Sequence, residues 1–309
     1  MNLFILTIAL EGLFFMSPPE EAHEDGYRGI ARYGNDFVAV GSEGRIDRIS
    51  LSGELIQTGK FIGVNFNCVS SDDEMIIAAG NNGTIVFSTD GTTYTKAESC
   101  TDKDINSIAY FKKTIIAGAD HGEIITGDPQ GPLQRIIPGV KGNIVSVSAG
   151  SSGCYGVTDE GEIIQSSDGI SWEIFDLNRV YSGYYKPVRF SRVLVTEDRI
   201  LLTGLRDDGS PLLMFSSLGK VWTDRTLNYT DEGEMQGSLC DQPNDIFYDK
   251  ANDEFFIACS KGKLMMLPSC PHCNRLAVLT EEDLTGISSA GNTLIVVGSN
   301  FFVKTLNIR

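Results

Sequence analysis

Short apolar runs recur along the chain, and each ends in a turn that contains glycine, aspartate or asparagine. The seven runs are residues 37–40, 75–78, 114–117, 153–157, 200–203, 255–258 and 294–297. The turns that follow them end at Gly44, Gly83, Gly122, Gly161, Gly209, Gly262 and Asn300. The first three intervals between these turns are 39 residues each, and the later ones are 48, 53 and 38. Such a constant interval indicates a repeat array.

Each period contains a moderately apolar run, the fully apolar run, a turn, an alternating run such as Glu162–Gln165, and a second turn. Frequent turns between β-rich runs predict an all-β protein. A period of about 40 residues with four short strands is typical of a propeller blade. The second strand is expected to be apolar on both faces because each blade packs between two neighbours. The sequence therefore predicts a seven-bladed β-propeller with four-stranded antiparallel blades; the runs are too short for a helical solenoid.

The propeller is expected to form one domain that includes all residues from 1 to 309. The predicted blades are 26–60, 64–99, 104–139, 142–178, 187–228, 236–279 and 281–309 together with 1–11. Residues 2–10 are predicted to be the outer strand of the last blade, which gives both exposed edges a partner. This segment has no basic residue before its apolar part and no cleavage site after it. The sequence therefore favours folding in the cytoplasm, with secretion as the alternative.

Three segments share a further motif at the second turn of the period. They are Ser88–Tyr94, Ser166–Trp172 and Ser216–Trp222. Together with residues 34–41, they resemble the Asp-box (BNR) repeat, S-x-D-x-G-x-x-W in loose form. The resemblance implies that Asp90 and Asp168 cap the turn, while Trp172 and Trp222 pack over the blade as structural residues. Position 218 is leucine instead of aspartate, and the third blade keeps only a relic at residues 127–128.

Proteins with such repeats include sialidases, xyloglucan hydrolases, photosystem-assembly factors and phage virion proteins. A sialidase would need an R-I-P segment, an arginine triad and a Tyr–Glu pair, and residues 135–138 copy only the first, imperfectly. A glycosidase would need two facing carboxylates, for which Asp207 or Asp208 with Glu160 are the candidates. We therefore assign no catalytic residue and keep hydrolysis as the alternative function.

The net charge of the chain disfavours some classes of binding partner. The chain has 41 acidic and 25 basic residues, and its net charge of -16 disfavours nucleic acid and the basic patch expected of a photosystem-assembly factor. No apolar run has the roughly 18 residues that a membrane span needs. No cofactor and no metal ligand are assigned, although Ca²⁺ at an acidic channel mouth is the third hypothesis.

The seven cysteines are an odd number, so they cannot all be paired. Cys154 and Cys259 lie within apolar runs, where a thiol behaves as a small hydrophobic group. A reducing compartment and free thiols are the simpler expectation. Cys270 and Cys273 form a C-x-x-C motif for which an inert or turn-stapling role is favoured over redox or metal chemistry, and Cys240 with Cys259 gives no obvious second zinc pair.

In a propeller, the turns after the second strands and the connections between blades lie on one face. The longest connections are predicted at 11–27, 176–187 and 228–244. They should form an acidic rim interrupted by tyrosines. The predicted binding residues are Tyr181, Tyr184, Tyr185, Lys186, Arg189, Asp207, Asp208 and Glu160. Tyrosines on long loops are typical of interfaces and sugar platforms.

The leading hypothesis is therefore a non-catalytic propeller that docks another macromolecule. Its partner would be the protein subunits of a larger assembly, with a phage virion as the favoured setting, or a glycan. The alternative is an Asp-box carbohydrate-active hydrolase that uses the same face.

Overall fold

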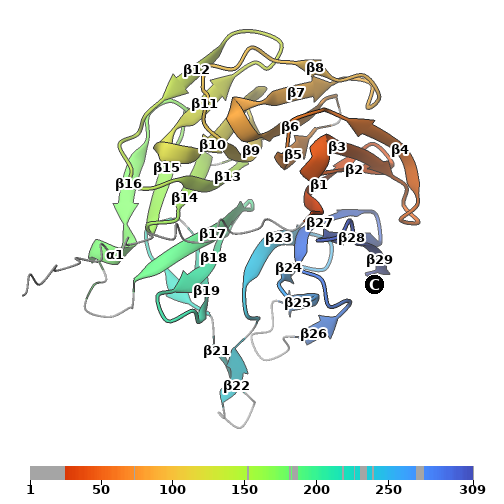
Figure 1. The fold of residues 1–309 in the computed structure, drawn as a ribbon. Helices are drawn as coiled ribbons and strands as arrows, with labels where there is room; N and C mark the ends of the chain where they lie inside the picture. Colours follow the sequence, from red (N-terminus) through yellow and green to blue (C-terminus); the bar gives the residue numbers. More distant parts are fainter. Residues whose placement is uncertain are drawn as a thin grey trace, which may run out of the picture.

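Seven antiparallel sheets form a ring in the computed structural model, and each sheet is one blade (Figure 1). The structure describes residues 25–72, 74–151, 153–180, 182, 187–217, 219–225, 227–229, 235–238, 240–268 and 275–308. Blade 1 contains β1 (Tyr27–Tyr33), β2 (Asp36–Gly41), β3 (Arg45–Ile49) and β4 (Leu55–Lys60). Blade 2 contains β5 (Phe66–Ser71), β6 (Ile76–Gly80), β7 (Ile85–Ser88) and β8 (Thr95–Lys96). Blade 3 contains β9 (Ile105–Phe111), β10 (Thr114–Ala119), β11 (Ile124–Gly127) and β12 (Leu133–Ile136).

The remaining blades follow the same order from the axis outward. Blade 4 contains β13 (Ile144–Gly150), β14 (Gly153–Thr158), β15 (Glu162–Ser166) and β16 (Glu173–Asp176). Blade 5 contains β17 (Val188–Val195), β18 (Ile200–Arg206), β19 (Pro211–Ser216) and β20 (Thr223–Asp224). Blade 6 contains β23 (Pro243–Asp249), β24 (Glu254–Cys259), β25 (Lys263–Pro268) and β26 (Arg275–Val278). Blade 7 contains β27 (Leu284–Ala290), β28 (Thr293–Gly298) and β29 (Val303–Asn307).

Short elements interrupt this pattern. The short helix α1 (Leu177–Val180) joins blades 4 and 5, and the hairpin of β21 (Leu227–Tyr229) and β22 (Met235–Ser238) joins blades 5 and 6. Single 3-10 turns, η1 (Ser42–Gly44), η2 (Asn81–Gly83) and η3 (Asp120–Gly122), follow the second strands of blades 1 to 3. No helix in the described part of the chain is long and apolar enough to cross a membrane.

The hydrophobic core is divided among the interfaces between blades. Each core cluster in the described part contains residues from two neighbouring blades, as in the cluster of Val38 and Ile46 with Phe66 and Ile76. The second strands contribute to clusters on both of their faces, so β6 and β14 are buried along their whole length. This arrangement confirms the predicted all-β, seven-bladed propeller and explains the fully apolar runs.

The ring closes between blades 7 and 1. The Asn300 amide donates to the Asp25 carbonyl at 2.7 Å, and the Thr285 hydroxyl donates to the Tyr27 carbonyl at 2.6 Å. Arg45 of blade 1 lies 4.0 Å from the ring centroid of Phe301 of blade 7. The described part of blade 7 has three strands, and residues 2–10, the predicted fourth strand, lie outside the described residues. That closing strand therefore stays a prediction.

The turns between third and fourth strands have a recurring hydrogen-bond pattern in blades 2 and 4. Asp90 Oδ1 accepts hydrogen bonds from the amides of Thr92 (2.8 Å) and Thr93 (2.7 Å). Asp168 makes the equivalent bonds to Ile170 (2.8 Å) and Ser171 (2.7 Å). These backbone donors hold the pKa of both carboxyl groups well below the usual range. The two aspartates therefore accept backbone hydrogen bonds that stabilise these turns.

The glycines and aromatic residues of these turns contact the preceding blade. Gly169 has a positive φ of 78°, and a Cβ there would lie 2.9 Å from Ile116 of blade 3. Trp172 packs on the cluster between blades 3 and 4, and Trp222 is buried between blades 4 and 5. Each of these turns therefore covers an interface between blades.

The expectation that the cysteines are free thiols is wrong for two of them. Cys240 and Cys259 form a disulfide, with their Cα atoms 6.2 Å apart. Cys240 precedes the first strand of blade 6, and Cys259 ends its second strand, so both lie at the same end of the blade. Cys68, Cys100 and Cys154 are thiols, while Cys270 and Cys273 lie outside the described residues.

Candidate functional site on the turn face

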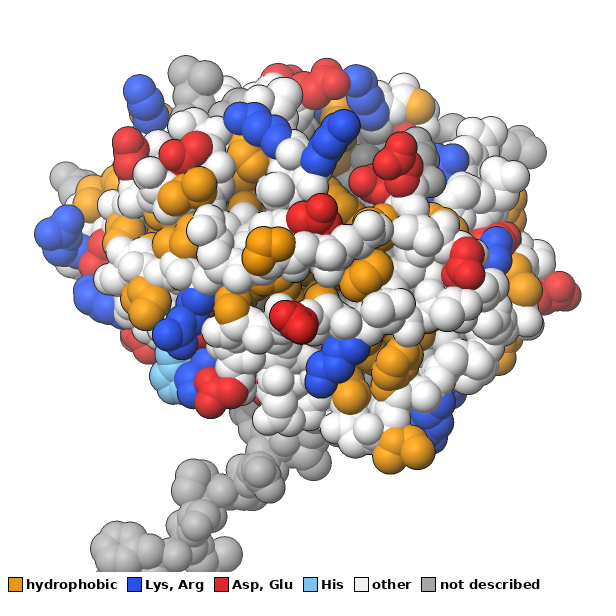
Figure 2. All heavy atoms as spheres, turned by 90° about the horizontal axis from the view of Figure 1, so that it is seen from above, with side chains coloured by type: hydrophobic (Ala, Val, Ile, Leu, Met, Phe, Trp, Pro, Cys, Tyr) orange, Lys and Arg blue, Asp and Glu red, His pale blue; other side chains and the backbone are white. Residues whose placement is uncertain are grey.

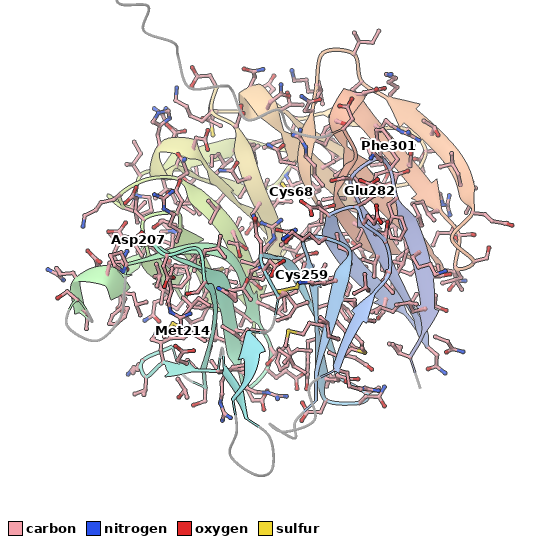
Figure 3. All side chains as sticks on the ribbon, turned by 60° about the horizontal axis from the view of Figure 1, so that its bottom comes forward. Cys68, Asp207, Met214, Cys259, Glu282 and Phe301 are labelled. Carbon is pink, nitrogen blue, oxygen red and sulfur yellow. A yellow bond between two sulfur atoms is a disulfide. The ribbon has the colours of Figure 1, made fainter. Side chains whose placement is uncertain are left out.

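We define the turn face as the end of the ring that carries the turns after the second strands and the connections between blades. Asp207, Glu282 and Phe301 mark this face on blades 5 to 7 (Figure 3). Hydrogen bonds from the middle amide of a turn to the side chain before the next blade hold it together. We call them turn bonds: Glu43 to Asn65 (3.0 Å), Asn82 to Asp104 (2.8 Å), His121 to Asn143 (3.0 Å) and Lys261 to Asp283 (2.7 Å). Each turn bond therefore joins two blades.

A second set of bonds surrounds the axis just below this face. Every first strand has a β-bulge near its start, and its bulged residue is Arg28, Asn67, Asn106, Val145, Ser191, Asn244 or Thr285. Five of these side chains donate to a backbone carbonyl of the next blade, which we call bulge bonds. They are Asn67 to Ile105 (3.1 Å), Asn106 to Ile144 (3.2 Å), Ser191 to Pro243 (2.8 Å), Asn244 to Leu284 (2.9 Å) and Thr285 to Tyr27 (2.6 Å).

The interface between blades 4 and 5 departs from both patterns. The side chain of Val145 has no polar group, so this residue cannot make a bulge bond. Asn178 of α1 takes over the connection: its amide nitrogen donates to the carbonyls of Glu160 (2.9 Å) and Val188 (3.1 Å), and its oxygen accepts from the Val188 amide (2.8 Å). One side chain therefore joins the turn of blade 4 to the start of blade 5.

This junction assembles part of the predicted site. Arg189, Asp207, Asp208 and Glu160 are all exposed. The Asp207 amide donates to the carbonyl of the residue before β17 at 2.9 Å, which holds the blade 5 turn beside the start of that strand. Asp208 Oδ1 accepts from the Ser210 hydroxyl at 2.6 Å, so it stabilises its own turn. Tyr181, Tyr184, Tyr185 and Lys186 lie outside the described residues.

The predicted acidic rim is interrupted by lysines. Lys60 pairs with Glu43 at 2.9 Å and lowers the pKa of that exposed carboxyl group. Lys141 pairs with Asp176 at 2.9 Å, which raises the pKa of the lysine. Lys261 and Lys263 share Asp241. The side of the ring around β8 and β12 likewise shows acidic and basic side chains interspersed (Figure 2).

Other rim carboxylates accept hydrogen bonds from asparagines near the start of the first strands. Asp159 accepts from the amide and side-chain nitrogens of Asn143 at 2.8 and 2.9 Å, and Asp120 accepts from Asn106 at 2.9 Å. Three or more His, Cys, Asp or Glu side chains do not converge as a metal site anywhere in the described ranges. These carboxylates therefore stabilise the turns. The sequence indicated in general that such residues form turns, but not which groups these carboxylates bind.

Three exposed aliphatic residues on this face were not predicted from the sequence. Ile62 is 95% exposed in the connection between blades 1 and 2, Ile137 is 64% exposed between blades 3 and 4, and Val180 is 50% exposed in α1. Branched aliphatic side chains in connections next to Gly63 and Pro138 are a signal that was available in the sequence. Their exposure is not, because it depends on how each connection folds.

Known structures share the fold of this chain, while no protein-family model and no curated protein matches it. The structure of YCF48 bound to D1 peptide is similar, with a TM-score of 0.69 and 15% identity, and the match covers 93% of this chain and 94% of that one. The WD40 propeller domain of Doa1 gives 0.65 and 13%, covering 92% and 93%. The computationally designed protein Ika8 gives 0.62 and 14%, covering 93% and 98%. These similarities establish the propeller fold.

Proposed function

We propose that this propeller is a non-catalytic docking module that binds a protein segment on its turn face. The observation that carries the proposal is the exposure of Ile62, Ile137 and Val180 on connections of the same face. The core of a protein interface is depleted in charged residues, so these apolar side chains are the contacts that we expect a protein segment to use. The propellers of similar fold include one bound to a peptide and a WD40 domain, which supports this class of partner.

The finer assignment rests on the resemblance to Asp-box proteins. The capped turns at Asp90 and Asp168 support membership of that class. Among its settings, we favour a structural role in a larger assembly such as a virion, with folding in the cytoplasm. We rank the hydrolase alternative second: its candidates Glu160, Asp207 and Asp208 are exposed on neighbouring turns, and Asp208 accepts a hydrogen bond within its own turn.

A selection from a random peptide library against the full chain tests the docking function. We expect wild-type protein to enrich peptides, and the triple variant Ile62→Ser, Ile137→Ser, Val180→Ser to lose them while its melting temperature stays unchanged. The matched control is the double variant Ile170→Ser, Val221→Ser, whose side chains are 56% and 74% exposed at the other end of the ring. No enrichment by wild-type protein, or equal loss in the control, would refute a docking site on the turn face.

A further inference from the structure

A groove of about 290 Å³ opens on the outer part of blade 4, away from the turn face. Tyr155, Gln165 and Glu173 from three adjacent strands line it, together with Trp172 and the serines of the Asp168 turn. The turn between β19 and β20 of blade 5 borders it, because a Cβ at Gly219 would lie 2.8 Å from the Tyr155 hydroxyl. Its volume is near the lower end of small-ligand sites, which span about 300–1,000 Å³.

In blades 2 and 5 the same positions are closed by apolar packing. Strand register aligns Tyr155, Gln165 and Glu173 of blade 4 with Ile77, Phe87 and Thr95 of blade 2 and with Leu201, Phe215 and Thr223 of blade 5. Phe87 and Phe215 pack onto the clusters shared with the following blades. Blade 4 has an amide and a carboxylate where those blades have a phenylalanine and a threonine, so the slot beside its neighbour stays open.

Two polar groups of the groove have no hydrogen-bond partner among the described residues: the Tyr155 hydroxyl, which solvent reaches, and the buried Nε1 of Trp172. Tyr155 is 8% exposed, and its hydroxyl makes no hydrogen bond to any described residue. Burial raises its pKa, so the hydroxyl stays protonated and can donate. A ligand with its own hydroxyl groups would give this donor a partner.

The other groups of the groove are arranged for a polar, uncharged ligand. The Gln165 amide donates to Glu173 at 2.9 Å, which fixes its orientation and leaves its carbonyl oxygen available to accept. Lys112 of blade 3 donates to the Ser167 carbonyl at 3.0 Å, so one positive charge at the edge of the groove accompanies the negative charge of Glu173. The half-buried Trp172 supplies an aromatic surface.

We propose that this groove binds a neutral sugar ring. Sugar hydroxyl groups both donate and accept, which matches the tyrosine, the amide and the carboxylate. The C–H face of a sugar packs on an aromatic ring such as Trp172. A phosphate would meet no arginine here, and an apolar ligand would leave the Tyr155 hydroxyl without a partner. The proposal stands apart from protein docking, since the groove lies beside the turns at the opposite end of the ring.

Ligand-observed NMR with the full chain and a panel of neutral methyl glycosides (glucose, galactose, mannose and N-acetylglucosamine) tests this site. We expect binding by wild-type protein, and affinity at least about tenfold weaker in Glu173→Ala and in Tyr155→Phe, each of which removes hydrogen bonds to the ligand. The matched control is Gln134→Ala, the equivalent exposed position in the outer strand of blade 3, which should bind like wild type.

Neither groove variant is expected to unfold the protein, so a loss of binding can be assigned to the groove. Glu173 is exposed, and Tyr155→Phe keeps the buried ring, so melting temperatures should stay near that of wild-type protein. Absence of binding across the panel would overturn the proposal. So would binding that survives both substitutions, because the sugar would then lie elsewhere on the molecule.

Discussion

The interfaces among blades 1 to 4 and those around blade 5 join neighbouring blades by different means. The first group repeats one solution: a turn bond on the turn face and a bond from the bulged residue near the axis, as with Asn82 and Asn67 between blades 2 and 3. Between blades 4 and 5, Val145 makes no such bond and Asn178 substitutes. In blade 6, a disulfide at Cys240 fixes the segment that enters from blade 5.

The difference shows how a repeat accommodates long connections. The bulge bond survives the long connection at 225–242, since Ser191 still donates to Pro243 between blades 5 and 6, and it does not form where the bulged residue is Val145. Each long connection also supplies a linking group of its own: Asn178 in 177–187 joins blades 4 and 5, and Cys240 in 225–242 forms a disulfide with Cys259 of blade 6. Insertions at these two points therefore add surface to the turn face without opening the ring.

The largest expected effect comes from the disulfide. It joins residues 19 positions apart, and removing a crosslink of that span costs about 3 kcal/mol of unfolding free energy. We expect reduction by dithiothreitol, or the double variant Cys240→Ala, Cys259→Ala, to lower the midpoint of denaturant unfolding accordingly. Blades 1 to 4 should need no such crosslink.

The control for the disulfide prediction is the double variant itself, because added reductant should no longer change its midpoint. The thiols of Cys68 and Cys154 do not complicate the measurement: burial raises the pKa of each to about 12, which suppresses thiolate attack. Wild-type unfolding midpoints that are equal with and without reductant would contradict a stabilising role for this bond.

The next largest effect tests the exceptional interface. Asn178→Ala removes three hydrogen bonds that join blades 4 and 5, and we expect it to cost about 2 kcal/mol. Asn65→Ala removes a turn bond between blades 1 and 2, where the Arg28–Asn67 bond remains, and should cost about half as much. Equal losses in chemical denaturation would show that the two interfaces do not differ in redundancy.

The fold could be predicted from the sequence because its core is built from repeated local units. Each buried second strand is a contiguous apolar run, and its partner strands follow within the same period, so spacing alone specifies the blades. Helix α1 and the β21–β22 hairpin were not predicted, since both lie in connections that have no counterpart in the other periods. The Cys240–Cys259 pair was also missed: an odd number of cysteines excludes complete pairing but not one bond.

The sites were less predictable for a different reason. A rim of carboxylates can be inferred from the turns, but their partners, such as Lys60 for Glu43, come from other strands. The groove left a signal in the sequence, because Gln165 and Glu173 replace an aromatic and a threonine of blades 2 and 5. That signal becomes readable only when the periods are aligned by strand register.

The smallest predicted effect concerns pH and the capped turns. Backbone hydrogen bonds lower the folded-state pKa of Asp90 and Asp168, so their stabilisation is present above the ordinary aspartate pKa of about 4 and is lost as pH falls below it. The double variant Asp90→Asn, Asp168→Asn should therefore melt slightly below wild-type protein at pH 7, and this difference should shrink between pH 4 and pH 2. Glu54→Gln is the control, in the equivalent turn of blade 1, where the carboxylate accepts no hydrogen bond from the described residues. A melting difference that persists unchanged at pH 2 would show that the turns depend on the shape of the side chain and not on its charge.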